Sequence, residues 1–355
     1  MLCILSFFVF AILGIFSASH RALAKKAWYC LVKKIQFKPC DINFNEELKG
    51  KLLGKLLFTH PSAARFLYKW IDVISVGFVI ISIWSLLVVG KSTIYLLAYD
   101  TCNPYSEQGC SLAGDSCTIN VTSMSFISSV KNGLVIDWTK LHASTFAEAI
   151  TRIPNRFKTW DPADFLPSKP SYYTAYDSNQ PLALEIVDPS CHFCAELYKN
   201  IKASKAYERY KLAYIAYPIP NSTGYRFPNS LVMTKYLEAA KSLPRIDGMS
   251  ADWYLLDAIF TGSDEAGTTW QDKFNIVFTD DQARTQLETF LRQAGYSDEQ
   301  IAMVRTAADS AEIQSAVDAN RLIVEDRVKT IKIPTIMIGG RRFDRLIDAD
   351  KLRSL

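Results

Sequence analysis

The sequence is poor in the residues that build metal centres. It has only four histidines in 355 residues, and no second CxxC pair or histidine pair accompanies its one CxxC sequence, Cys191 to Cys194. Zinc sites use four Cys or His ligands at short, regular spacings, so the clustered Cys102, Cys110 and Cys117 do not predict one. We expect no metal site, and nothing in the sequence implies a bound cofactor.

No basic residue precedes the first apolar stretch, about residues 2–18, whereas a signal peptide carries its positive charge there. Ala22-Leu23-Ala24 does resemble a cleavage site, so removal of this stretch stays an alternative to a retained anchor. A second apolar stretch, residues 71–90, is long enough to span the ~30 Å hydrocarbon core of a bilayer. The sequence therefore predicts two N-terminal transmembrane helices.

The net charge of +4 is unevenly distributed. Residues 20–70 hold 11 Lys or Arg against 3 Asp or Glu, whereas residues 100–355 hold 28 against 32. The positive-inside rule places this basic loop in the cytoplasm, and hence the N-terminus and the C-terminal region outside. Because topology and anionic lipid explain the basic loop, we expect contact with the lipid bilayer and no nucleic acid. The predicted localisation is the cell (plasma) membrane, as a two-pass protein.

Cysteines on the outer side of the membrane can form disulfides. We expect the CxxC pair to form the working disulfide there. Another four cysteines on that side could supply up to two structural bridges, whose pairing stays open: Cys3, Cys102, Cys110 and Cys117.

The chain divides into three predicted regions. Residues 1–98 form the membrane anchor, and residues 99–175 form an extracytoplasmic stalk and linker that contains the clustered cysteines. Residues 176–355 form a domain of β and α elements, in which a helical block at about 225–312 separates two β pieces. The second β piece contains Gly339-Gly340 between apolar runs, which is typical of a tight hairpin turn.

Cys191 begins a predicted helix directly after an apolar strand that ends at Asp188-Pro189. A thiolate in this place faces unpaired backbone N–H groups and the positive end of the helix dipole, which lower its pKa. His192 could add a nearby imidazolium, although a solvent-exposed loop histidine is an equal alternative. We therefore expect Cys191 to be the reactive sulfur, and a stabilised thiolate makes its disulfide the stronger oxidant.

Three parts of the last region together resemble the DsbA-like thiol-disulfide oxidoreductases of the thioredoxin superfamily. They are the stretch from Glu185 to Cys194, the helical block, and Ile333-Pro334-Thr335 followed by Ile338-Gly339-Gly340-Arg341. The resemblance covers roughly residues 176–355. It implies an α/β fold, with a thioredoxin-like mixed sheet interrupted by a helical insertion.

The resemblance also implies roles for individual residues. Cys191 is the attacking cysteine, Cys194 is the resolving one, and Glu185 is the acidic residue beneath the disulfide, which could carry a proton for Cys194. Pro334 matches the cis-proline that contacts substrate in this family. The full set of candidate substrate-binding residues is Phe193, Ile333, Pro334 and Thr335.

The predicted function is a membrane-anchored extracytoplasmic enzyme that forms disulfides in exported, cysteine-containing proteins. It would need a membrane partner for reoxidation, namely a quinone-linked disulfide generator, because neither predicted span has a cysteine pair for that task. The same site run as a disulfide reductase or isomerase is one alternative. A non-catalytic module that uses a thioredoxin-like groove to hold a partner is the other.

Overall fold

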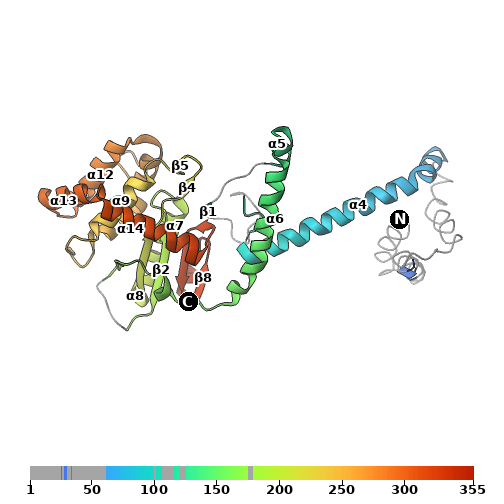
Figure 1. Ribbon diagram of the computed structural model, residues 1–355. Coiled ribbons are helices and arrows are strands. Elements are labelled where there is room, and N and C mark those ends of the chain that lie inside the picture. Colours follow the sequence, from blue (N-terminus) through green and yellow to red (C-terminus); the bar gives the residue numbers. More distant parts are fainter. Residues whose placement is uncertain are drawn as a thin grey trace. The chain divides into compact units, whose positions relative to one another are not determined.

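The computed structural model describes residues 61–99, 101–105, 116–119, 125–174 and 179–355, with Lys25, Trp28, Tyr29 and Lys33. The chain divides into two compact units, Met1–Lys91 and Ser92–Leu355 (Figure 1). The first predicted transmembrane stretch, most of the basic loop, Cys3 and Cys110 lie outside the described residues. The two-pass topology therefore stays a prediction.

The helix α4 (Pro61–Tyr99) contains the predicted span at residues 71–90. The part of α4 that is long and apolar enough to cross a membrane is Ile80–Tyr99, with a mean hydropathy of 1.8. This stretch lies closer to the C-terminus than we predicted, because Lys91 is the only charge between Asp72 and Asp100 and the apolar run continues past it. It is the one such helix in the part of the chain that the structure describes.

The stalk contains two helices, α5 (Phe126–Lys131) and α6 (Val135–Arg152), followed by the short 3-10 helices η1 (Ile153–Phe157) and η2 (Pro162–Phe165). Within the second unit, α6 packs on the last turns of α4, where Ala149 joins Tyr95 and Tyr99 in a small apolar cluster. The guanidinium of Arg152 lies 5.2 Å from the centre of the Tyr99 ring.

A four-stranded mixed sheet forms the centre of the second unit, in the order β3-β2-β7-β8. The strand β2 (Leu182–Val187) runs parallel to β3 (Lys211–Ala216) and antiparallel to β7 (Thr335–Ile338), which pairs antiparallel with β8 (Arg341–Phe343). The helices α7 (His192–Ser204) and α8 (Ala206–Arg209) connect β2 to β3, and α15 (Ala349–Arg353) ends the chain. This order and these directions are those of a thioredoxin-like sheet.

Both strands of the parallel pair are buried on each face, and each has five buried residues in succession after its first residue. Continuous apolar stretches are typical of such strands. Gly339 and Gly340 form the turn between β7 and β8 with φ of 58° and 73°, the positive values that a tight primed turn requires. The hairpin prediction is therefore correct.

A helical insertion lies between β3 and the strand β6 (Lys332–Ile333), and Figure 1 shows its helices gathered together beside the sheet. The small hairpin of β4 (Pro220–Asn221) and β5 (Gly224–Tyr225) precedes it. The insertion consists of α9 (Ser230–Ala240), α10 (Ala251–Thr261), α11 (Trp270–Asp272), η3 (Lys273–Val277), α12 (Asp280–Gln293), α13 (Asp298–Ala308), α14 (Ala311–Leu322) and η4 (Ile323–Val328). It extends beyond the predicted end at 312, because Val317, Val324 and Val328 continue the buried face.

The predicted boundary between linker and domain at residue 176 is placed too late. Trp160, Phe165 and Tyr173 belong to the same apolar core as the sheet. Large aromatic side chains bury a great deal of apolar surface, so a stretch rich in them packs against the domain although its prolines favour a linker.

Candidate active site

Cys191 lies at the N-terminal end of α7, in a turn that follows β2. Its N–H donates to the carbonyl of Asp188 (3.0 Å), and its own carbonyl accepts from the N–H groups of Cys194 (2.9 Å) and Ala195 (3.2 Å). Cys191 is the N-cap residue of the helix. The CxxC sequence therefore spans the N-cap and first turn, at the place that the strand, turn and helix pattern predicted.

The carboxylate of Asp188 holds this turn together. Its Oδ1 accepts from the N–H of Ser190 (2.8 Å) and the hydroxyl of Ser230 (2.6 Å), and its Oδ2 accepts from the N–H of Ile219 (2.8 Å). Burial raises the pKa of Asp188 to about 6, against the opposing effect of these hydrogen bonds. Sequence reasoning treated Asp188 only as a strand end, since nothing local announces its three donors.

Two amide side chains from the insertion fix the same turn. Gln271 donates to the carbonyl of Pro189 (3.0 Å), and Asn275 donates to the carbonyl of Ser190 (2.9 Å). These carbonyls precede the CxxC pair and are covered by the insertion. The insertion therefore positions the reactive turn, a role that its helical periodicity did not predict.

Cys194 and Glu185 are both fully buried. Burial raises the pKa of Cys194 to about 11, and the nearby Cys117 and Glu185 act in the same direction. Burial also raises the pKa of Glu185 to about 8, and neither of its carboxyl oxygens has a hydrogen-bond partner among the described residues. A carboxyl group in this state holds a proton at neutral pH, close to the second sulfur of the pair.

Cys191 has no exposed surface, and this burial raises its pKa well above the usual value of a thiol, although the contact with Cys117 acts in the opposite direction. The prediction of a lowered pKa at Cys191 is therefore wrong for this arrangement. A helix terminus contributes at most about 2 kcal/mol, and the cost of removing a charge from water exceeds that. His192 is exposed, and its ring packs on Phe193 with the centroids 3.8 Å apart.

The Ile333-Pro334 peptide is cis and lies against the CxxC pair. The Sγ atom of Cys191 is 4.0 Å from the carbonyl oxygen of Ile333. Ile333, Pro334 and Thr335 are all buried, and Phe193 is half-buried. Of the predicted substrate-binding residues, Ile333 and Pro334 are therefore the ones adjacent to the reactive sulfur.

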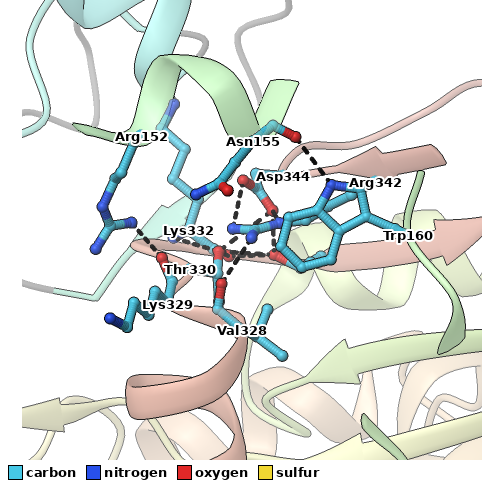
Figure 2. A network of polar contacts seen from close by, with 10 residues as sticks. Arg152, Asn155, Trp160, Val328, Lys329, Thr330, Lys332, Arg342 and Asp344 are labelled. Atoms are coloured by element: carbon cyan, nitrogen blue, oxygen red, sulfur yellow. Dashed lines mark hydrogen bonds and ion pairs between the residues drawn. The ribbon is translucent and has the colours of Figure 1, made fainter. Parts of the chain in front are cut away.

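A polar network holds the segment that carries this peptide (Figure 2). Arg342 donates from Nε to Asp344 (2.7 Å) and from Nη1 to the carbonyl of Val328 (2.7 Å), and Trp160 lies over its guanidinium. The hydroxyl of Thr335 donates to the same Asp344 oxygen (3.0 Å). Thr335 therefore positions the segment from inside rather than facing a substrate.

Cys117 of the stalk lies at the active site. The strand β1 (Cys117–Thr118) pairs antiparallel with β6, which puts Cys117 opposite Ile333. The Sγ atoms of Cys117 and Cys191 are 2.6 Å apart, and both thiols are free and buried. The prediction that Cys117 belongs to a structural bridge of the stalk is therefore wrong.

Cys102 is disulfide-bonded, and its partner lies outside the described residues. Of the four candidates for structural bridges, Cys102 is thus the one that the structure places in such a bond. The other two, Cys3 and Cys110, are untested.

The strand order, the helical insertion and the buried CxxC pair define a thioredoxin-like domain that resembles the DsbA-like thiol-disulfide oxidoreductases. No protein-family model and no curated protein sequence matches the chain. Three of the solved structures to which it is similar have the following values. MdbA, a thiol-disulfide oxidoreductase from Corynebacterium diphtheriae, is 16% identical over 52% of this chain and 93% of its own, with a TM-score of 0.36. DsbG, a disulfide bond oxidoreductase from Mycobacterium tuberculosis, is 11% identical over 55% and 97%, with a TM-score of 0.36. ScsC from Proteus mirabilis is 12% identical over 64% and 94%, with a TM-score of 0.38.

Proposed function

We propose that this chain is a membrane-anchored extracytoplasmic thiol-disulfide oxidoreductase that forms disulfides in exported proteins. The observation that carries the proposal is the surroundings of Cys191. Its Sγ atom contacts the thiol of Cys194 on the same helix and the thiol of Cys117 on another segment, beside the backbone of Ile333. A sulfur that touches two other sulfurs is placed to pass from one disulfide to another.

The reaction starts from the Cys191 to Cys194 disulfide. A substrate thiolate attacks Sγ of Cys191, the bond between the two cysteines breaks, and Cys194 leaves and takes a proton, for which Glu185 is the nearby donor. A second substrate thiolate then attacks the substrate sulfur of the mixed disulfide and releases Cys191. The substrate loses two electrons and two protons, and the enzyme is left as the dithiol.

The location and partners are part of the proposal. The apolar stretch Ile80–Tyr99 precedes the domain and is the described candidate for a membrane span. The basic residues before it favour the cytoplasmic side for residues 20–70. Reoxidation then falls to a membrane protein of the quinone-linked disulfide-generating kind.

A disulfide reductase or isomerase is the second candidate, and the raised pKa of Cys191 favours it. A thiol that holds its proton stabilises the dithiol less than a thiolate does, so its disulfide is a weaker oxidant. The reduction potential decides between these directions. A value near the about −270 mV of thioredoxin supports the reductase, and a value near the about −120 mV of DsbA supports the oxidase.

Trapping of mixed disulfides tests whether the site is catalytic at all. The Cys194→Ser variant of the full chain cannot release a substrate from Cys191, so exported proteins are expected to accumulate as covalent adducts. The matched control is the Cys191→Ser and Cys194→Ser double variant, which has no attacking sulfur. Because Cys117 competes for Cys191, the same trap is repeated with Cys117→Ser.

Adducts that appear with Cys194→Ser, and disappear with the control, support the enzyme. If no adduct forms even after removal of Cys117, the non-catalytic binding module is the better account.

A further inference from the structure

The short stalk segment of residues 116–119 is docked on the active site as an added strand. Cys117 lies opposite Ile333, Thr118 lies opposite Lys332, and the N–H of Ile119 donates to the carbonyl of Ile331 (2.9 Å). Ser116, Cys117 and Ile119 are buried. Main-chain pairing of this kind is how an extended peptide is recognised at a free strand edge.

The docked segment presents a thiol to the reactive sulfur. Cys117 is 3% exposed, Cys191 has no exposed surface, and their Sγ atoms are in contact at 2.6 Å. No substrate can reach Cys191 while the segment is in place, because the segment itself covers that sulfur.

We propose that residues 116–119 are an internal substrate of the CxxC pair, and that Cys117 exchanges into a disulfide with Cys191 that closes the site. The inference rests on the proposed function, since it needs a reactive Cys191 to Cys194 disulfide. It assigns to Cys117 a regulatory role in place of a structural one.

The exchange is balanced without any further oxidant. The thiolate of Cys117 attacks Sγ of Cys191, a bond forms between these two sulfurs, and the bond from Cys191 to Cys194 breaks. Cys194 leaves with the electron pair and takes up the proton that Cys117 lost, through Glu185 or water. One disulfide replaces another, so the protein keeps its two oxidising equivalents in the closed form.

The geometry also indicates the class of external substrate. A competitor has to be an extended, cysteine-containing segment that runs antiparallel to residues 331–333 and puts its thiol where that of Cys117 lies. A tethered segment has an effective concentration in the millimolar range, so external substrates compete only when they bind this edge well. The closed form would thus restrict the enzyme to substrates with strong main-chain pairing.

Disulfide mapping of the full chain in detergent tests the exchange. The Cys194→Ser variant is equilibrated with oxidised glutathione, digested without reduction and analysed by mass spectrometry. We expect the peptide that contains Cys117 to be joined to the one that contains Cys191, with glutathione released. A Cys191 that carries glutathione beside a free Cys117 thiol would overturn the proposal.

Substitutions at Ile119 test whether main-chain pairing drives the exchange. Ile119→Pro removes the N–H that donates to Ile331, whereas Ile119→Ala removes the same buried side chain and keeps that donor. In the Cys194→Ser background, we expect the yield of the Cys117 to Cys191 disulfide to fall several-fold for proline and less for alanine. Equal yields from the two variants would contradict a docked strand.

Turnover of an external cysteine peptide separates this inference from the proposed function. We expect Cys117→Ser to react roughly tenfold faster than the natural chain, because the internal competitor is gone. Two inactive proteins would refute the enzyme itself, and the latch with it. Two equally active proteins, with no Cys117 to Cys191 disulfide, would refute the latch and leave the enzyme standing.

Discussion

The Sγ atoms of Cys117 and Cys191 lie 2.6 Å apart, although 74 residues separate the two cysteines in the chain. One belongs to the stalk and the other to the first turn of α7. The stalk is thereby more than a spacer between the membrane helix and the domain, because part of it completes the surface of the active site. The state of the reactive sulfur depends on whether this segment is docked.

Undocking the segment is expected to activate Cys191. Burial raises the pKa of Cys191, and Ile119→Pro weakens the pairing that keeps the sulfur buried. An exposed thiol at a helix N-terminus has a lowered pKa, and each unit changes the thiolate fraction about tenfold at a given pH. The reduced full chain with Ile119→Pro should therefore be alkylated at Cys191 at least tenfold faster at pH 7.

The measurement is the alkylation rate of Cys191 as a function of pH, followed by mass spectrometry of the peptide. Ile119→Ala serves as the matched control, since it keeps the backbone donor. An unchanged pH midpoint in the proline variant would show that the segment does not set the reactivity of this sulfur.

The parts of the site that local sequence patterns predicted are those on one strand or helix. Cys191 and Cys194 were found because a strand, a turn and a helix adjoin in sequence, and Pro334 because a proline at a strand start is unusual. Glu185 was placed by the family resemblance, and its burial agrees with the neighbouring buried strand.

The position of Cys117 could not be predicted in this way. Its partner Ile333 lies more than two hundred residues further along the chain, and a strand of two residues has no periodicity of its own. The same limit applies to the pKa of Cys191. A helix N-terminus is visible in the sequence, whereas the segment that buries the sulfur is a tertiary contact.

Glu185→Gln is expected to change how stability depends on pH. The pKa of Glu185 is about 8 in the folded chain and about 4.5 when unfolded, so below pH 4.5 both states are protonated and no stability is lost. Between these values the unfolded state gives up the proton and the folded state keeps it. The free energy of unfolding should therefore fall, by up to about 1.4 kcal/mol per pH unit, as pH rises through that window.

The glutamine variant lacks this loss, so its advantage over the natural chain should grow from pH 4.5 to 8. Unfolding of the full chain in detergent, followed by tryptophan fluorescence, measures the difference. Glu196→Gln is the control, because Glu196 is an exposed residue of α7 that pairs with Lys199. A parallel pH dependence in all three proteins would refute a buried, neutral Glu185.

Thr335→Val should loosen the segment that carries β6. The Thr335 hydroxyl contacts the carbonyl of Lys332 (2.7 Å), the hydroxyl of Thr330 (2.9 Å) and the carboxylate of Asp344 (3.0 Å), all in a buried setting. Valine keeps the shape and leaves these groups without their partner, at a cost of about 1–3 kcal/mol. The measured quantity is the free energy of unfolding.

Thr335→Ser is the matched control, since it keeps the hydroxyl and removes one methyl group. We expect the serine variant to lose less stability than the valine variant. The reverse order would mean that packing of the methyl group, and not the polar network, holds this segment.

Asp188→Asn should destabilise the turn that presents the CxxC pair. Both carboxylate oxygens of Asp188 accept hydrogen bonds, from Ser190 and Ser230 on one oxygen and from Ile219 on the other. An asparagine has a single acceptor oxygen, so its amide N–H₂ group would face either the N–H of Ile219 or the other two donors. The buried donor that loses its partner costs about 1–3 kcal/mol.

Ser230→Ala removes one of the same three hydrogen bonds without placing two donors against each other, so it is expected to cost only about 1 kcal/mol. Thermal unfolding of the full chain in detergent compares the two variants. A loss at Asp188→Asn no greater than that at Ser230→Ala would mean that the two oxygens are not both needed as acceptors. A larger loss, with slower exchange at Cys191, would show that the reactive turn depends on this one buried carboxylate.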